Sequence, residues 1–348
     1  MFTSDHCLIK KLVVHRINND ANDDAPHCSK SLHQPLEEEL HKNLLRFFLQ
    51  AFTTPEYFTF TYPNEDFTLN PMFDFCGEIF DKENLFLKNS IQIAKHLYNV
   101  SAQQEGKAGD LFVVYFSGLQ MDGEDVDAIG IFKSENKFPF LKVQKNSDDL
   151  YINREEGINI DKLEKGCLVF NKNVEAGLKI CIVDKFGKPA EAQRWKDDFL
   201  QLRPMLDNYH HTKQFLDVTR TFVMDQLSDE FEVSKADKID LLNRSVAYFK
   251  KNDSFNKSEF EKEVFQDAGV IKAFRNFNEQ YAEDHEFDIT EQFDVSPQAV
   301  KKQTSVFKSV LKLDKNFHIY IHGNKELIEH GIEKDGRKFY KIYYKEEA

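Results

Sequence analysis

The feature that most restricts the fold is a series of short apolar runs between residues 109 and 184. GDLFVVYFSG at 109–118 and DAIGIFKS at 127–134 flank Asp122-Gly123, a dipeptide typical of a two-residue hairpin turn. Three more runs follow: FPFLKV at 138–143, GCLVFNK at 166–172 and LKICIVD at 178–184. Parallel strands need long crossover connections, usually helices, which this region lacks. The sequence therefore predicts an antiparallel sheet.

Helical periodicity flanks this region on both sides. Before it, apolar residues at steps of three and four predict helices that start near Pro35 and span 84–100. After it, apolar residues recur at helical spacing from Trp195 to about Leu227, and Ser234 is a candidate N-cap for a helix that reaches about Lys250. The chain closes with two strand-like runs, SVLKLDKNFHIYIHG and KFYKIYYK, which predict a C-terminal β-hairpin.

These elements predict an α+β fold with an N-terminal antiparallel sheet and helices, a helical middle segment and a C-terminal β-hairpin unit. A composition shift near Pro189 predicts two domains, residues 1–190 and residues 191–348. Two alternatives remain for the final hairpin. Either it packs back on one of the two halves, or it completes the sheet of a second copy, because long aromatic strands rarely remain exposed edges. The second alternative predicts a homodimer.

Composition excludes two classes of protein. Of the 348 residues, 41% are hydrophobic and 30% are charged, which is ordinary for a globular chain and excludes a largely disordered one. No stretch reaches the ~20 apolar residues of a membrane helix, and Lys10 and Lys11 interrupt the apolar run near the start, unlike a secretory signal. Five cysteines without CxxC spacing predict neither a disulfide framework nor a zinc knuckle. We therefore expect a cytoplasmic protein.

Charge is distributed unevenly along the chain. The net charge of −13 opposes attraction of the whole surface to nucleic acid, because that affinity depends on cations that replace counterions. The segment from Val300 to Lys345, however, contains eleven Lys and Arg residues and only five Asp and Glu residues. This end of the chain is therefore basic, and the rest is acidic. A basic end on an acidic body predicts either a local nucleic-acid contact or a protein partner of complementary charge.

Aromatic residues are interleaved with the cations of this basic end. Because cations can contact phosphates and aromatic rings can stack or brace, the predicted DNA-binding residues are Lys301, Lys302, Lys308, Lys312, Lys315, Lys325, Arg337, Lys338, Lys341 and Lys345. The structural alternative is that alternate aromatic residues face the core and the cations solvate the other face. The residues alone favour this alternative, since only a clustered patch is an electrostatic footprint.

No sequence signature of an enzyme is present. The chain has no GxxxxGKS/T loop, no GxGxxG after a strand, no GxSxG elbow and no HExxH helix. His318 and His322 would share one face of a strand, but a pair falls short of the usual metal-ligand count. We expect a non-catalytic protein with no catalytic residues, no metal and no cofactor. A metal-dependent enzyme acting on nucleic acid remains an alternative.

Four long blocks of the sequence carry a family resemblance. They are DAIGIFKSENKFPFLKV at 127–143, GINIDKLEKGCLVFN at 157–171, VSKADKIDLLNRSVAYF at 233–249 and SVLKLDKNFHIYIHGNKELIEHGIEKDGRKFYKIYY at 309–344. Together they resemble the bacterial nucleoid-associated protein family of the NdpA or YejK type, in its Bacteroidetes-like form. The resemblance extends over nearly the whole chain.

The resemblance implies a cytoplasmic protein of the nucleoid that binds double-stranded DNA directly or indirectly and acts with type II topoisomerases. It brings no catalytic residues. Two mechanisms are compatible with it. In the first, the C-terminal cations contact phosphates without reading bases, which gives weak, salt-dependent and sequence-tolerant binding that organises the chromosome. In the second, the acidic body is an adaptor or regulator that binds a type II topoisomerase or another DNA-handling protein. No membrane partner is expected.

Overall fold

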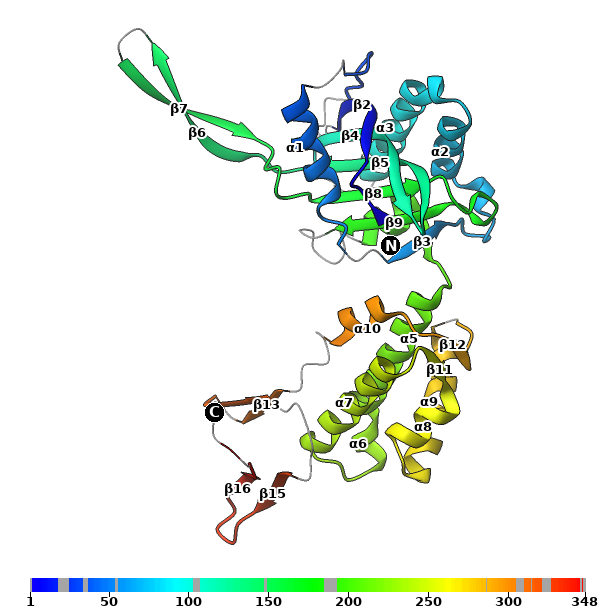
Figure 1. Cartoon of the computed structure of the whole chain (residues 1–348), viewed down its shortest axis with the longest axis vertical. Coiled ribbons are helices and arrows are strands. Elements are labelled where there is room, and N and C mark those ends of the chain that lie inside the picture. Colours follow the sequence, from blue (N-terminus) through cyan, green and yellow to red (C-terminus); the bar gives the residue numbers. More distant parts are fainter. Residues whose placement is uncertain are drawn as a thin grey trace. The chain divides into compact units, whose positions relative to one another are not determined.

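The computed structural model describes residues 2–17, 25–33, 37–53, 56–102, 107–146, 149–184, 193–285, 287–304, 310–313, 315–320, 327–344 and 346 (Figure 1). The chain divides into two compact units, Met1–Met205 and Leu206–Ala348, and each unit has a hydrophobic core of its own. A boundary near residue 190 between independently folding domains stays a prediction. Helices and antiparallel strands occur together in the first unit, which confirms the α+β class.

The first unit is built on an antiparallel sheet. Among the described residues its strand order is β1-β4-β5-β8-β9-β3-β10, and β2 pairs with β4 along the same edge as β1. The predicted turn joins β4 to β5, where Asp122 (φ 55°) and Gly123 (φ 83°) both adopt the positive φ of a type I′ turn. The strands are β1 (Phe2–Thr3), β2 (Leu8–Ile17), β3 (Tyr57–Phe60), β4 (Gly109–Met121), β5 (Glu124–Ser134), β8 (Lys165–Phe170), β9 (Lys179–Asp184) and β10 (Leu202–Pro204).

Helices cover both faces of this sheet (Figure 1). One face packs against α2 (Pro71–Asp81), α3 (Phe86–Ala102) and a π-helix at Arg194–Leu200. The other face packs against α1 (Glu38–Leu49). Both faces of β4 and β5 are buried, so the sequences of these strands are nearly continuous apolar runs instead of alternating apolar and polar residues. Short 3₁₀ turns lie at Phe67–Leu69, Glu83–Leu85 and Val174–Ala176.

A long hairpin projects from the first unit, away from the sheet (Figure 1). It consists of β6 (Phe138–Asn146) and β7 (Asp149–Gly157), which pair with each other and with none of the other described strands. The FPFLKV run is therefore a strand, as predicted, but it lies outside the antiparallel sheet. We call the pair β6–β7 the arm.

The second unit has a helical body with an aromatic core. The ring of Phe215 lies at its centre, with centroids 4.3 Å from Phe255 and 5.0 Å from Phe260. Ser234 caps α7 through a capping box with Asp237, which confirms the predicted N-cap. The elements are α5 (Asn208–Thr221), a π-helix at Phe222–Gln226, α6 (Leu227–Glu230), α7 (Lys235–Lys251), β11 (Ser254–Asn256), α8 (Lys257–Val264), α9 (Ala268–Asp284), β12 (Gln292–Asp294) and α10 (Pro297–Thr304).

The helical spacing from Trp195 to Leu227 does not form one continuous helical segment. The chain leaves the π-helix at Gln201, which has a φ of 52°, and then forms β10, which pairs with β3. Helix α5 starts afresh after Asp207, whose carboxylate accepts a hydrogen bond from the backbone N–H of His210. Backbone pairing with β3 thus overrides the apolar spacing in this stretch.

The C-terminal end contains two hairpins where the sequence predicted one. Strand β13 (Val310–Leu313) pairs with β14 (Phe317–Tyr320), and β15 (Ile328–Ile332) pairs with β16 (Lys338–Ile342). The predicted C-terminal β-hairpin unit is thus present, but the two strand-like runs do not pair with each other, because each run finds its partner locally. The first run folds back on itself around the polar turn at Lys315 and Asn316.

Candidate nucleic-acid interface

The first two predicted DNA-binding residues lie on α10. Residues Ala299, Val300 and Gln303 of this helix are buried, so Lys301 and Lys302 lie on its exposed side. The Nζ of Lys302 is 5.9 Å from the centroid of the Tyr209 ring, a cation–π contact that orients one of the two side chains. Helix α10 therefore presents two adjacent positive charges to solvent.

The β13–β14 hairpin packs one face on α7. Leu313 and Ile319, which lie on that face, contact Ile239 of α7. The register places position 312, a predicted DNA-binding lysine, opposite His318 on the other face of the hairpin. Lys315 in the turn and the ring of Tyr320 are exposed. The outward face thus combines cationic and aromatic positions.

The β15–β16 hairpin also contacts α7, through Ile328 and Tyr340. Burial and the nearby Asp237 carboxylate raise the pKa of Tyr340 above its ordinary value. Lys338 lies on the same face as Tyr340, whereas Lys341 lies on the opposite face. The predicted cations of this hairpin are therefore divided between its two faces. The contacts with Ile239 show that both hairpins pack back on the helical half.

Two of the cations of the β15–β16 hairpin form ion pairs with acidic neighbours. The guanidinium of Arg337 forms ion pairs with Asp335 at 2.7 Å and with Glu333 at 3.3 Å. Lys341 lies 3.5 Å from Glu329, and a hydrogen bond with Tyr343, together with that carboxylate, raises the pKa of Lys341. Arg337 and Lys341 thus present less net charge to an incoming phosphate than isolated cations would.

Three of the predicted residues, Lys308, Lys325 and Lys345, lie outside the described residues, as does His322. The seven described ones lie on three elements: α10, the β13–β14 hairpin and the β15–β16 hairpin. That all ten contact DNA stays a prediction. In the described part of the chain, no three His, Cys, Asp or Glu side chains gather as metal ligands, and none of the helices there has the length and apolarity to cross a bilayer.

A comparison with protein families gives one match. The model described as nucleoid-associated protein YejK matches residues 13–337, nearly the whole chain. The chain belongs to this family. No curated protein matches the chain. The YejK match begins within β2 and ends just before β16, so it includes the arm and reaches Arg337, whereas Lys338, Lys341 and Lys345 follow its last matched residue.

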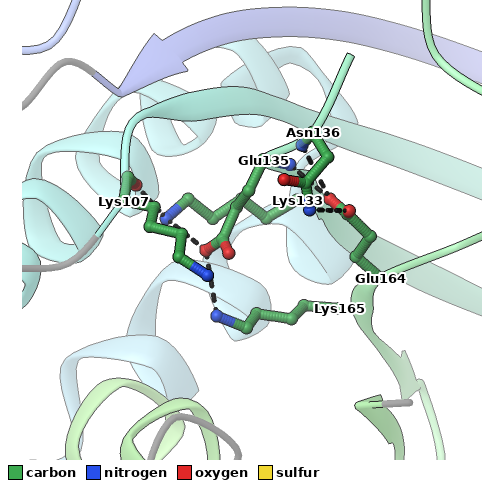
Figure 2. A network of polar contacts seen from close by, with 6 residues as sticks. All are labelled: Lys107, Lys133, Glu135, Asn136, Glu164 and Lys165. Carbon is green, nitrogen blue, oxygen red and sulfur yellow. Dashed lines mark hydrogen bonds and ion pairs between the residues drawn. The ribbon is translucent and has the colours of Figure 1, made fainter. Parts of the chain in front are cut away.

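Sequence reasoning missed a buried cluster of charges at the base of the arm (Figure 2). The Oε1 of Glu135 accepts hydrogen bonds from the Nζ atoms of Lys133 and Lys165, each at 2.9 Å. Lys133 also donates to the carbonyl of Lys107 at 2.6 Å. Burial lowers the pKa of Lys133, although Glu135 opposes that shift. Burial also raises the pKa of Glu135, but the two lysines outweigh this effect and hold its pKa below the ordinary value.

The same cluster fixes the chain where it enters the arm. The carboxylate of Glu164 accepts hydrogen bonds from the backbone N–H groups of Glu135 and Asn136, the latter at 3.1 Å, and from the Asn136 side chain. The next residue, Lys137, forms an ion pair with Asp110, which also accepts two hydrogen bonds from Arg16 at 2.8 and 3.0 Å. The only sequence signal was the alternation of Lys and Glu around residues 133–137 and 164–165, which is also common on solvated surfaces.

Proposed function

We propose that this chain is a non-catalytic protein of the cytoplasmic nucleoid, and that it contacts double-stranded DNA through its basic C-terminal residues. The observation that carries the proposal is the contrast in charge within a member of the YejK family. Eleven Lys and Arg residues against five acids lie between Val300 and Lys345, whereas the rest of the chain is strongly acidic. A local contact lets a chain of net charge −13 bind a polyanion.

The exposed lysines are suited to phosphates rather than to bases. Lys301, Lys315 and Lys338 are exposed, and none forms an ion pair among the described residues. A lysine ammonium acts as a point charge, which neutralises phosphate without the paired geometry that reads a base edge. Exposed rings such as Tyr320 add apolar contact area beside these charges. This arrangement supports weak, salt-dependent and sequence-tolerant association that would organise the chromosome.

The test is to replace Lys301, Lys315 and Lys338 by Gln in the full chain and to measure duplex binding at several salt concentrations. If each lysine contacts one phosphate, the slope of log K against log salt becomes shallower by about 2.7, since one contact contributes about 0.9. A matched control replaces Lys250, Lys262 and Lys272 by Gln. These are exposed lysines of α7, α8 and α9, so the change in net charge is identical.

The comparison of the two triple variants decides the proposal. We expect the control to keep the wild-type slope and to bind DNA within about twofold of the wild-type affinity. The C-terminal variant should bind DNA more weakly and with a shallower slope. Equal losses in the two variants would show that only net charge matters, and no loss in the C-terminal variant would remove these residues from the interface.

A second candidate function follows from the acidic body. Outside residues 300–345 the acidic residues outnumber Lys and Arg, which disfavours DNA and suits a basic protein surface. In this alternative the chain is an adaptor or regulator of a type II topoisomerase or another DNA-handling protein. A purified type II topoisomerase should then bind the chain after nuclease treatment, with an affinity that falls as salt rises. Loss of binding on nuclease treatment would show that DNA bridges the two.

A further inference from the structure

Both C-terminal hairpins pack on one residue of α7. In the described parts of the β13–β14 and β15–β16 hairpins, the side chains that are not exposed are Leu313, Ile319, Ile328 and Tyr340. All four pack against Ile239, which is only 8% exposed. Each hairpin thus contributes two side chains to one small apolar cluster, and Ile239 is its one buried member among the described residues. We call Ile239 the anchor.

The two hairpins have no larger sheet to support them. Among the described strands, β13 pairs only with β14, and β15 pairs only with β16. An isolated two-stranded hairpin is at best marginally stable in water, so it needs an apolar surface to pack on. The cluster around Ile239 provides that surface for both hairpins.

The anchor is separate from the aromatic core of the second unit. Helix α7 contributes Leu242 and Val246 to the core around Phe215. Ile239, nearer the start of the helix, forms a cluster with hairpin residues alone. Replacing Ile239 therefore acts on the hairpins and leaves the core contacts of α7 in place.

The third cationic element, α10, packs on the same helix. Val300 of α10 belongs to the core cluster that contains Val246 of α7. Lys301 of α10 is exposed, as are Lys315 between β13 and β14 and Lys338 of β16. Helix α7 is thus the common support of the three elements that carry the described lysines of the predicted DNA contact.

We propose that Ile239 is a positioning residue for DNA binding, because it holds the two hairpins on α7 beside α10. This inference rests on the proposed contact between the basic C-terminal residues and a duplex. With the anchor in place, Lys315 and Lys338 are presented together with Lys301 before DNA arrives. Without the anchor the same lysines remain, but binding also has to order the hairpins, which lowers the affinity without removing a charge.

The test replaces Ile239 by Gln in the full chain. Glutamine is uncharged and has a higher helix propensity than isoleucine, so the substitution does not weaken α7 through propensity or charge. The matched control is Ile271→Gln, the same change at a partly buried position of α9 that packs against the helical core. The conservative variant is Ile239→Leu, which keeps an apolar side chain of similar volume at the anchor.

Hydrogen exchange in the absence of DNA measures the anchoring. In Ile239→Gln the backbone amides of β13, β14, β15 and β16 should exchange at least about tenfold faster than in the wild type, whereas those of α5 should keep their rate. Ile239→Leu and Ile271→Gln should leave exchange in the hairpins unchanged. If hairpin exchange in Ile239→Gln equals that of the wild type, Ile239 is not the anchor and the proposal is wrong.

Duplex binding at several salt concentrations measures the positioning. We expect Ile239→Gln to bind at least about fivefold more weakly at every salt concentration, with an unchanged slope of log K against log salt, because every lysine is still present. Ile239→Leu and Ile271→Gln should bind within about twofold of the wild type. Wild-type affinity in Ile239→Gln, an equal loss in Ile271→Gln, or a shallower slope in Ile239→Gln would each overturn the positioning role.

These outcomes separate the inference from the proposed function. If Ile239→Gln binds like the wild type while the triple lysine variant loses affinity, the lysines contact DNA but Ile239 does not position them. If the wild type itself does not bind a duplex, the proposed function fails and the inference fails with it.

Discussion

The Nζ of Lys133 lies 2.9 Å from Oε1 of Glu135, and the two side chains are only 4% and 5% exposed. Lys165 shares the same carboxylate oxygen. A buried charge that loses its partner is costly, whereas a complete buried set is tolerated. Lys133 lies near the end of β5, Lys165 begins β8, and Glu135 directly follows β5. The one carboxylate therefore binds two cations and joins these two strands at the base of the arm.

Replacing Glu135 by Gln should destabilise the first unit strongly. The substitution keeps the shape of the side chain but leaves Lys133 and Lys165 without their shared anion, so we expect a loss of about 3–5 kcal/mol in the free energy of unfolding. Urea unfolding followed by circular dichroism measures it. The control is Glu38→Gln, which removes an exposed pair with Lys42 and should change stability by no more than about 0.5 kcal/mol. Equal effects in the two variants would contradict the role of burial.

The same ion pairs predict a dependence on acid pH. Lys133 and Lys165 hold the pKa of Glu135 below its ordinary value of 4.5 despite the opposing effect of burial. Its stabilising contribution is therefore present above pH 4.5 and is lost as the pH falls through the lower folded-state pKa. The stability difference between wild type and Glu135→Gln should shrink below pH 4.5. A difference that stays constant down to pH 2 would exclude this linkage.

His15 should give a second acid effect in a higher pH range. The Ser29 backbone N–H donates to its Nδ1 at 3.2 Å, so Nε2 carries the proton and donates to Ser90 Oγ at 3.1 Å. Burial lowers the pKa of His15 from 6.5 to about 4. Between pH 6.5 and about 4 the imidazole of His15 is protonated in the unfolded chain but neutral in the folded chain. The free energy of unfolding should therefore fall as the pH drops over this range. In His15→Asn, the fall over that range should be smaller, and an identical fall would refute this assignment.

Replacing either of two glycines of the first unit by Ala should change the free energy of unfolding, but in opposite directions. A Cβ at Gly130 of β5 would lie 2.4 Å from the ring of Phe132 and 2.6 Å from that of Phe116, so overpacking should cost about 1–3 kcal/mol. At Gly77, inside α2, a Cβ meets nothing within 4 Å, so Gly77→Ala should add about 0.5–1 kcal/mol by helix propensity. Thermal melts of both variants measure the difference. A stabilised Gly130→Ala would mean that the core relaxes around the methyl group.

Local signals predicted the parts of the fold that local physics determines. The turn at Asp122-Gly123 requires two residues with positive φ, and few dipeptides other than Asn-Gly and Asp-Gly supply them. Ser234 could be recognised because a hydroxyl before an apolar periodic run satisfies a free backbone N–H. Both predictions depend on residues within three or four positions of each other. They needed no knowledge of distant contacts.

The other features of the fold and of the candidate site depend on contacts between residues far apart in the sequence, so local sequence patterns could not predict them. The mostly apolar FPFLKV run is equally compatible with a strand in a core and with an arm whose apolar face lies open, because the run itself does not say what covers that face. The charge on the C-terminal end was visible, but the pairing of Lys341 with Glu329 depends on the β15–β16 register. The cluster around Glu135 likewise joins residues about thirty positions apart.

The most direct test of the central claim is the salt dependence of wild-type binding to a duplex of random sequence. If C-terminal lysines such as Lys301, Lys315 and Lys338 neutralise phosphates, log K should fall linearly with log salt, with a slope of about −2.7 or steeper for three or more contacts. Duplexes of different sequence should give the same line. Absence of binding in dilute salt, or an affinity that does not change with salt, would contradict a local cationic contact between this chain and DNA.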